Sequence, residues 1–295
     1  MSTAGTKINP IHIVGGEKGG VGKTFISRAL CHYFNANGEV YALIEADSQI
    51  DDVGRIYKNQ AAESHKITLS DDPKRSTEPD VILDTAGKTT ALVNLPSNTQ
   101  AVLDRWMART NLLQLMEDRL GGNRLVKWFV SDGCHESMRQ LDQSIFALDG
   151  SIPHIVVLNR GRLHNVNFSY LQSKGLYQRA KAQKNFVAEI EFPALENSVQ
   201  YFIDENELTL DAAREKIAEE QGILAEQRIV TFVEDFSKAF DSAIARLEEF
   251  WDTPNIVGSG AGESSDGNDA SQESEDGNSP DGHRNTKVEM AEAQS

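Results

Sequence analysis

Residues 15–24 contain the side chains whose types and spacing point most directly to chemistry. The segment reads Gly-Gly-Glu-Lys-Gly-Gly-Val-Gly-Lys-Thr and follows a short apolar run at residues 11–14. Glycines let backbone N–H groups curl around an anion, and the N-terminus of a following helix adds the positive end of its dipole. Lys23 can reach the β- and γ-phosphates of a nucleotide, and the Thr24 hydroxyl can ligate Mg²⁺. The sequence therefore predicts a phosphate-binding loop.

Two further segments carry candidate polar groups just after an apolar run. Asp47 follows the predicted strand at residues 40–44, and Asp84 and Gly87 follow a predicted strand at residues 79–83. In open α/β sheets, ligands bind outside the carboxyl ends of the strands. We therefore expect Asp84 to hold Mg²⁺ through a water and Gly87 to sense the γ-phosphate. Asp47 is a candidate catalytic acid, although a helix cap or turn is the alternative.

The elements around these segments predict an α/β domain. Apolar residues after the loop recur at helical spacing as Ile26, Ala29, Leu30, Tyr33 and Phe34. Continuous apolar runs, typical of a parallel sheet, predict strands at residues 125–130 and 155–160. An alternating strand is expected at 186–192 and a short one at 67–69, with helices at 99–120, 136–148, 210–220 and 224–251. We expect a doubly wound, mostly parallel sheet with helices on both faces, a three-layer αβα fold.

The string Lys-Gly-Gly-Val-Gly-Lys-Thr at residues 18–24 resembles the deviant Walker A motif of the ParA/MinD family of P-loop ATPases. The resemblance covers roughly residues 8–251 as an ordered set of motifs. It implies that the loop binds ATP through the residues Gly19, Gly20, Val21, Gly22, Lys23 and Thr24. Two departures are Glu17, where the standard motif has Gly, and Phe25, where relatives often carry Ser or Thr.

The same resemblance implies roles for three single residues. Lys18 would cross a dimer interface to the partner's nucleotide, Asp47 would orient the attacking water, and Asn159 would contact the adenine base. A solvated loop lysine and a turn-forming asparagine are the alternatives for Lys18 and Asn159.

The implied activity is slow, Mg²⁺-dependent ATP hydrolysis, stimulated by an unknown protein partner and coupled to ATP-dependent homodimerisation. Plasmid or chromosome partition, or cargo positioning, is the first expected role. The alternatives are an accessory ATPase in plasmid mobilisation or conjugation and, with less support, a metabolic ATP-dependent ligase of the same superfamily, such as dethiobiotin synthetase.

Composition limits these roles. The 295 residues carry a net charge of −16, and residues 258–295 contain nine acids against two bases. We expect an ATPase domain at 1–254 and a disordered acidic tail at 255–295. The two isolated cysteines exclude a disulfide framework. With no signal peptide and no apolar run of transmembrane length, a cytoplasmic protein is expected. A membrane role is not expected, because a terminal basic amphipathic helix is absent and the tail is acidic.

Non-specific DNA is a possible partner only if positive charge is gathered locally, because the body of the chain is acidic. The stretch from residue 160 to residue 184 is the best candidate. Its bases are Arg160, Arg162, Lys174, Arg179, Lys181 and Lys184. The alternative is a solvated face that binds no ligand.

Overall fold

The computed structural model describes residues 8–46, 51–162 and 168–253, the side chain of Arg162 excepted. Asp47 and the expected tail at residues 255–295 lie outside the described residues. Their predicted properties therefore stay predictions.

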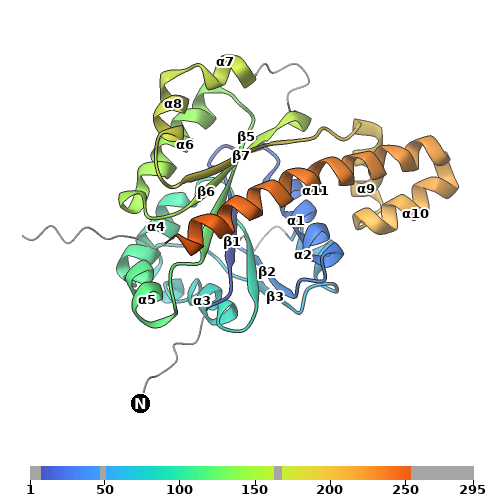
Figure 1. The fold of residues 1–295 in the computed structure, drawn as a ribbon. Coiled ribbons are helices and arrows are strands. Elements are labelled where there is room, and N and C mark those ends of the chain that lie inside the picture. The colour runs from blue at the N-terminus through green and yellow to red at the C-terminus, as the bar shows by residue number, and fades with distance from the viewer. Residues whose placement is uncertain (1–7, 47–50, 163–167, 254–295) are drawn as a thin grey trace, which may run out of the picture. The chain divides into compact units, whose positions relative to one another are not determined.

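The described residues form a seven-stranded sheet in the order β3-β2-β4-β1-β5-β6-β7, and every neighbouring pair is parallel (Figure 1). The strands are β1 (Ile11–Gly15), β2 (Tyr41–Glu45), β3 (Glu63–Lys66), β4 (Thr90–Asn94), β5 (Leu125–Ser131), β6 (His154–Asn159) and β7 (Phe186–Phe192). The predicted doubly wound, parallel architecture is confirmed.

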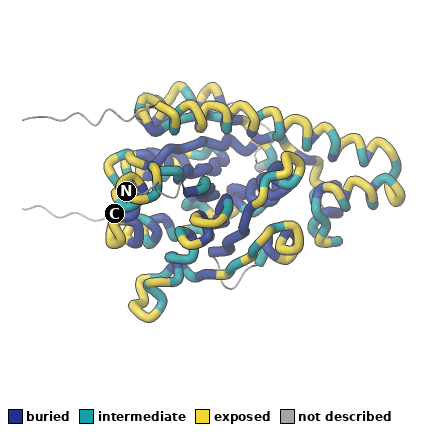
Figure 2. Tube along the Cα trace, turned by 60° about the horizontal axis from the view of Figure 1, so that its bottom comes forward, coloured by how far each residue is buried: buried dark blue, intermediate teal, exposed yellow. Residues whose placement is uncertain are grey.

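Helices cover both faces of this sheet, and Figure 2 shows the buried strands between the more exposed helices. One face packs against α1 (Lys23–Ala36), α2 (Gly54–Tyr57), α9 (Asn197–Glu205), α10 (Leu210–Gln221) and α11 (Ile223–Asp252). The other packs against α3 (Asp80–Ala86), α4 (Gln100–Arg109), α5 (Leu112–Arg119), α6 (His135–Phe146), α7 (Phe168–Gln172) and α8 (Gly175–Lys181). The alternation of strands with crossover helices produces the three layers.

Helix α11 packs its apolar stripe on the sheet, as its sequence pattern predicts. Phe232, Phe236 and Phe240 stack along the helix against Phe192 of β7, with ring centroids 5.5–6.1 Å from that of Phe192. Phe25 in the first turn of α1 stacks on Phe232 at 5.5 Å. Phe25, one of the two departures from the family pattern, therefore packs α1 against α11.

The expected strand at residues 79–83 is wrong, because Asp80–Ala86 form α3 and the strand beside β1 is β4. Three apolar residues between two acids do not distinguish a strand from a helix turn. Pro79 at the N-cap and Asp80 in the first turn are helix-start signals, and Ile82, Thr85 and Ala86 give the helix one buried side.

Three smaller expectations also change. The short strand is Glu63–Lys66 and not residues 67–69. The helix expected at 99–120 is split into α4 and α5 at Asn111, whose positive φ of 49° interrupts the helical backbone. Helix α9 occupies a segment for which the sequence predicted no element.

The aromatic stack on α11 predicts a stability cost. Phe236→Ala should lower the free energy of unfolding by about 3–5 kcal/mol, because a fully buried ring leaves a cavity. Tyr201→Ala, at a site that is 67% exposed, is the control and should change it by less than about 0.5 kcal/mol. Equal denaturant midpoints for the two variants would contradict the packing.

Candidate nucleotide-binding site

The loop between β1 and α1 needs glycine at specific positions. A Cβ on Gly16 would lie 2.6 Å from the carbonyl oxygen of Val130 on β5, so no larger residue fits there. Gly22, the N-cap of α1, has a φ of 101°, which side-chain-bearing residues rarely adopt. Gly20, Gly22, Lys23 and Thr24 line a cavity of about 430 Å³. The loop therefore presents the start of α1 to an open space.

Lys23 contributes a buried positive charge to this cavity. Its Nζ donates to Ser97 Oγ at 2.8 Å and to the carbonyl oxygen of Lys18 at 3.3 Å. Burial lowers the pKa of Lys23 to about 8, and the nearby Glu17 acts in the opposite direction. An ammonium whose contacts are neutral oxygens is suited to receive a phosphate, because the phosphate restores a charged partner.

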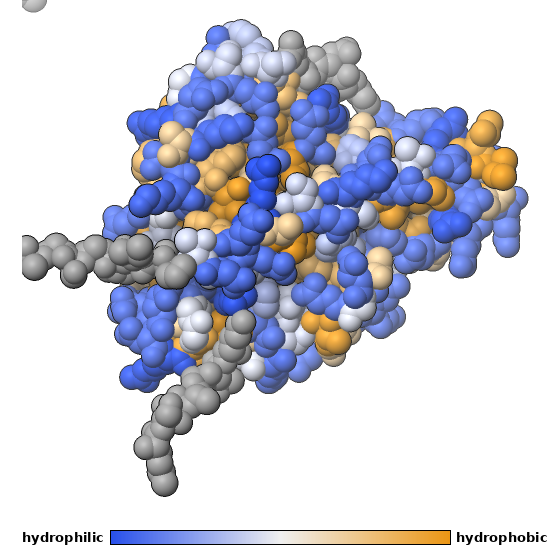
Figure 3. Space-filling view, viewed as in Figure 1, coloured by the Kyte–Doolittle hydropathy of each residue, from blue (hydrophilic) through white to orange (hydrophobic). Residues whose placement is uncertain are grey.

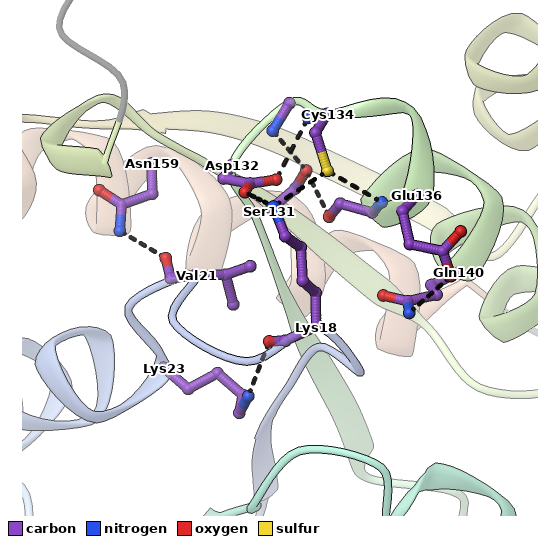
Figure 4. Close-up of polar contacts among 11 residues, drawn as sticks. Lys18, Val21, Lys23, Ser131, Asp132, Cys134, Glu136, Gln140 and Asn159 are labelled. Atoms are coloured by element: carbon purple, nitrogen blue, oxygen red, sulfur yellow. Dashed lines mark hydrogen bonds and ion pairs between the residues drawn. The ribbon is translucent and has the colours of Figure 1, made fainter.

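Lys18 points away from Lys23 and contacts its own subunit (Figure 4). Its Nζ donates to Asp132, immediately after β5, and lies 3.2 Å from the sulfur of Cys134. The hydrogen bond to Asp132 raises the pKa of Lys18. Cys134 is the N-cap of α6, so these contacts tie the loop to the β5–α6 connection.

Asn159 reaches the loop from the end of β6. Its Nδ2 donates to the carbonyl oxygen of Val21 at 2.8 Å, and its Oδ1 accepts from the Gly161 N–H at 2.9 Å. It also lines a small pocket that adjoins the main cavity, together with Phe25 and Pro193. The amide keeps one N–H free of these two bonds, so a contact to a base stays a prediction.

The strand next to β1 ends in an amide and not in an acid. Asn94 lies in register with Val14 on one side and Glu45 on the other. Its Oδ1 accepts from Ser27 Oγ and its Nδ2 donates to Glu45 Oε2, both at 2.9 Å. Glu45 also accepts the Val53 N–H, and burial raises the pKa of its carboxyl. These side chains form a buried polar chain below the cavity.

Asp84 and Gly87 are not brought to this site. They line a separate pocket with Ile8 and lie where α3 leads into β4. The Asn9 N–H bonds to Ala86, which places this segment beside the beginning of β1. Because β1 and β4 are parallel, the segment lies at the opposite edge of the sheet from the loop. The predicted magnesium role of Asp84 and phosphate-sensing role of Gly87 are therefore wrong.

A family model described as "CobQ/CobB/MinD/ParA nucleotide binding domain" matches residues 12–249. The chain belongs to this family. The match covers most of the sequence and confirms the resemblance that the loop indicated. The cavity at the loop is accordingly the candidate nucleotide site.

Individual relatives are more distant. Protein MobD from Acidithiobacillus ferrooxidans is 39% identical over 61 residues, which are 21% of this chain and only 26% of that protein. An Archaeoglobus fulgidus nucleotide-binding protein in complex with ADP has 13% identity and a TM-score of 0.45, covering 68% of this chain and 88% of that one. MinD from Aquifex aeolicus has 14% identity and a TM-score of 0.42, covering 78% and 97%. The family model therefore carries the assignment.

The family implies a nucleotide-bound divalent cation, and the donors here suit one. Thr24 and Asp52 both line the cavity and offer a hydroxyl and a carboxylate. Mg²⁺ favours oxygen donors and keeps several waters, with phosphates as further ligands. Within the described residues no group of three His, Cys, Asp or Glu side chains is placed to hold a metal alone. The nucleotide would therefore supply part of the coordination.

Two arginines in the cavity wall are held by the helical arm, which consists of α9, α10 and the N-terminal half of α11 (Figure 1). Arg28 is buried, binds the carbonyl oxygen of Asp52 at 2.8 and 3.1 Å, and bonds to Asp204 of α9 at 2.5 Å. Arg55 pairs with Glu207, after α9, at 2.6 Å. The arm thus neutralises charge at the edge of the nucleotide site.

Sequence reasoning missed Asn94, Ser97 and Arg28. The apolar run at residues 91–93 is the same length as the run at 81–83, so run length did not distinguish β4 from α3. Arg28 gave no signal, because its partners Asp52 and Asp204 lie 24 and 176 residues away in the sequence.

Within the described residues, no helix combines the length and apolarity needed to cross a bilayer.

The position of Thr24 and Asp84 leads to a paired prediction. Thr24→Ala should weaken binding of Mg²⁺-nucleotide about tenfold, the equivalent of about 1.4 kcal/mol, because the cavity loses a metal donor. Asp84→Ala, at the other edge of the sheet, should bind as the wild type does. Titration calorimetry measures both, and a loss in the Asp84 variant would contradict the site.

The lowered pKa of Lys23 predicts a pH dependence. Below about pH 8 the ammonium predominates and attracts phosphate, and above it the free protein loses that charge. Nucleotide affinity should therefore fall as pH rises through 8, by up to about tenfold per pH unit. Lys23→Ala should abolish binding at any pH. A wild-type profile that stays flat to about pH 9.5 would contradict the role of Lys23.

Proposed function

We propose that this protein is a Mg²⁺-dependent ATPase that uses ATP-driven dimerisation as a switch. The observation that carries the proposal is the pair of lysines in one loop, with Lys23 in the cavity and Lys18 directed elsewhere. A single nucleotide in the cavity engages Lys23 and leaves Lys18 available for a second site. Membership in the nucleotide-binding family supports the same proposal.

The chain's own residues account for the proposed steps. Phosphates binding at the start of α1 replace the contacts of Lys23 with Ser97 and the Lys18 carbonyl. Lys18 leaves Asp132 and stabilises charge on the nucleotide of the partner subunit. Asp47 orients the attacking water. Bound Mg²⁺ would neutralise phosphate charge beside Thr24.

Three of the five described bases between residues 160 and 184 are already paired with acids, which weakens the case for DNA binding. Arg160 pairs with Glu191, Arg179 makes a bidentate pair with Asp142 at 2.8 and 2.5 Å, and Lys181 pairs with Glu189 at 3.3 Å. Phosphate binding would have to break these pairs, which weakens the electrostatic attraction.

Two cellular roles follow from the switch, partition or cargo positioning and accessory action in plasmid mobilisation or conjugation. The paired bases weaken DNA-based partition and leave a role exerted through a protein partner, which suits an accessory role in mobilisation. A metabolic ligase has less support, because a second lysine in the loop, as in the deviant Walker A motif, is better explained by a role at a partner's nucleotide.

Hydrolysis and dimerisation test the proposal together. Asp47→Ala should retain ATP, stop phosphate release and accumulate as a dimer, since it orients water without holding phosphate. Lys18→Ala should bind ATP and remain monomeric in light scattering, with turnover reduced about 10³-fold, the size of effect known for charge-stabilising groups supplied in trans. Undiminished phosphate release in the Asp47 variant, or an ATP-dependent Lys18→Ala dimer, would contradict the mechanism.

DNA binding separates the two cellular roles. Duplex DNA should bind only weakly to the wild type at low salt with ATP, because Lys181 is already paired with Glu189, and no better to Lys181→Glu/Lys184→Glu, whose reversed charges repel phosphates. Strong, ATP-dependent binding that the double variant loses would instead support DNA-based partition. The measurement is fluorescence anisotropy at low and moderate salt, with and without ATP.

A further inference from the structure

Lys127 is a buried cation that the proposed mechanism does not use. It lies within β5, the strand that pairs with β1, and only 2% of the residue is exposed. Lysine is almost never buried to this extent unless it is paired, because desolvation of an ammonium is costly. A methionine of similar length would fill the space without that cost. Packing alone therefore does not account for a lysine here.

The contacts of Lys127 lead to helices on one face of the sheet. Its Nζ donates to Ser144 Oγ of α6 at 2.7 Å and to Oε1 of Gln100, the first residue of α4. Ser144 continues to His154 on the neighbouring strand at 2.8 Å. Within the described residues, the hydrogen bonds of Lys127 all end on neutral groups. The ammonium therefore orients its neighbours and does not form a direct ion pair.

Gln100 connects Lys127 to the nucleotide-binding loop. Its Nε2 donates to Asp104 Oδ1 at 2.5 Å, and its backbone N–H donates to Glu17 Oε1 at 2.9 Å. The N–H at the start of a helix has no partner within the helix, and a carboxylate there is stabilised by the helix dipole. Glu17 occupies the position where the standard loop motif has glycine. Glu17, which departs from the motif, therefore has a hydrogen-bond partner at the start of α4.

Two further contacts place Lys127 and α4 against the loop. A Cβ on Gly15 would lie 3.0 Å from Lys127 Cε, so the lysine stem touches the root of the loop. Ser97, just before α4, accepts the hydrogen bond from Lys23. A shift of α4 would therefore disturb the loop at two residues, Glu17 and Lys23.

We infer that Lys127 is a positioning residue for the nucleotide-binding loop. It holds the Gln100 side chain, the N-terminus of α4 then holds Glu17, and the loop is preorganised for phosphates before they bind. The inference rests on the proposed nucleotide-binding function and adds to it a residue that never touches the nucleotide.

A double-mutant cycle tests this route. Lys127→Met, Glu17→Ala and the double variant are titrated with a non-hydrolysable ATP analogue and Mg²⁺ by calorimetry, and each is also melted. Each single variant should lose about tenfold in affinity, and the double variant should lose no more, because both changes break one connection. Lys127→Met should melt close to the wild type, because the desolvation that it avoids offsets the two hydrogen bonds that it loses. Lys88→Met, an exposed lysine, is the matched control and should bind as the wild type does.

The outcomes separate this inference from the proposed function. A wild type that binds no nucleotide overturns both. A wild type that binds while Lys127→Met binds equally well, or a double variant whose loss is the sum of the two single losses, overturns the inference alone. If Lys127→Met does not fold, Gln100→Met keeps the lysine and breaks the same connection. That variant must show the same loss of affinity, and unchanged affinity would overturn the inference.

Discussion

The parallel pairing of β1 with β4 on one side and β5 on the other is the constraint on which the site depends. It brings the carboxyl ends of three strands to one edge, so the loop after Gly15 meets Asn94 and Asp132 from distant parts of the chain. A parallel pair requires a crossover, and α3 and α4 supply it around β4. Local sequence alone does not produce such a meeting point, because each strand contributes only one or two side chains to it.

That dependence explains what the sequence could and could not predict. The loop at residues 15–24 was predictable because its residues are contiguous and glycines mark the positions where its backbone conformation excludes other residues. Asp84 was misplaced because an apolar triplet ending in an acid occurs in helices as readily as in strands. Lys127 was beyond sequence reasoning, since a lysine inside an apolar run looks like a tolerated polar residue until its neighbours on α4 and α6 are known.

The polar groups around the loop differ in burial. Glu45 and Asn94 are buried and hydrogen-bonded to each other, and Glu45 also accepts the Gly54 N–H. Lys18 is more exposed and is held by Asp132 and Cys134, contacts that a second charged partner can replace. The buried groups thus lie below the cavity, and Lys18 is the more exposed charged group of the loop.

The helical arm ends in a turn where Ile223 and Leu224 are 75% and 73% exposed, and Figure 3 shows an apolar patch at that projecting end. At the base of the arm, Asp204 and Glu207 form ion pairs with Arg28 and Arg55 of the cavity wall. Thermodynamic linkage makes any coupling between a ligand in the cavity and a macromolecule at the tip reciprocal. Whatever affinity a macromolecule gains at the tip when the cavity is filled, the ligand in the cavity gains by the same factor when the tip is occupied.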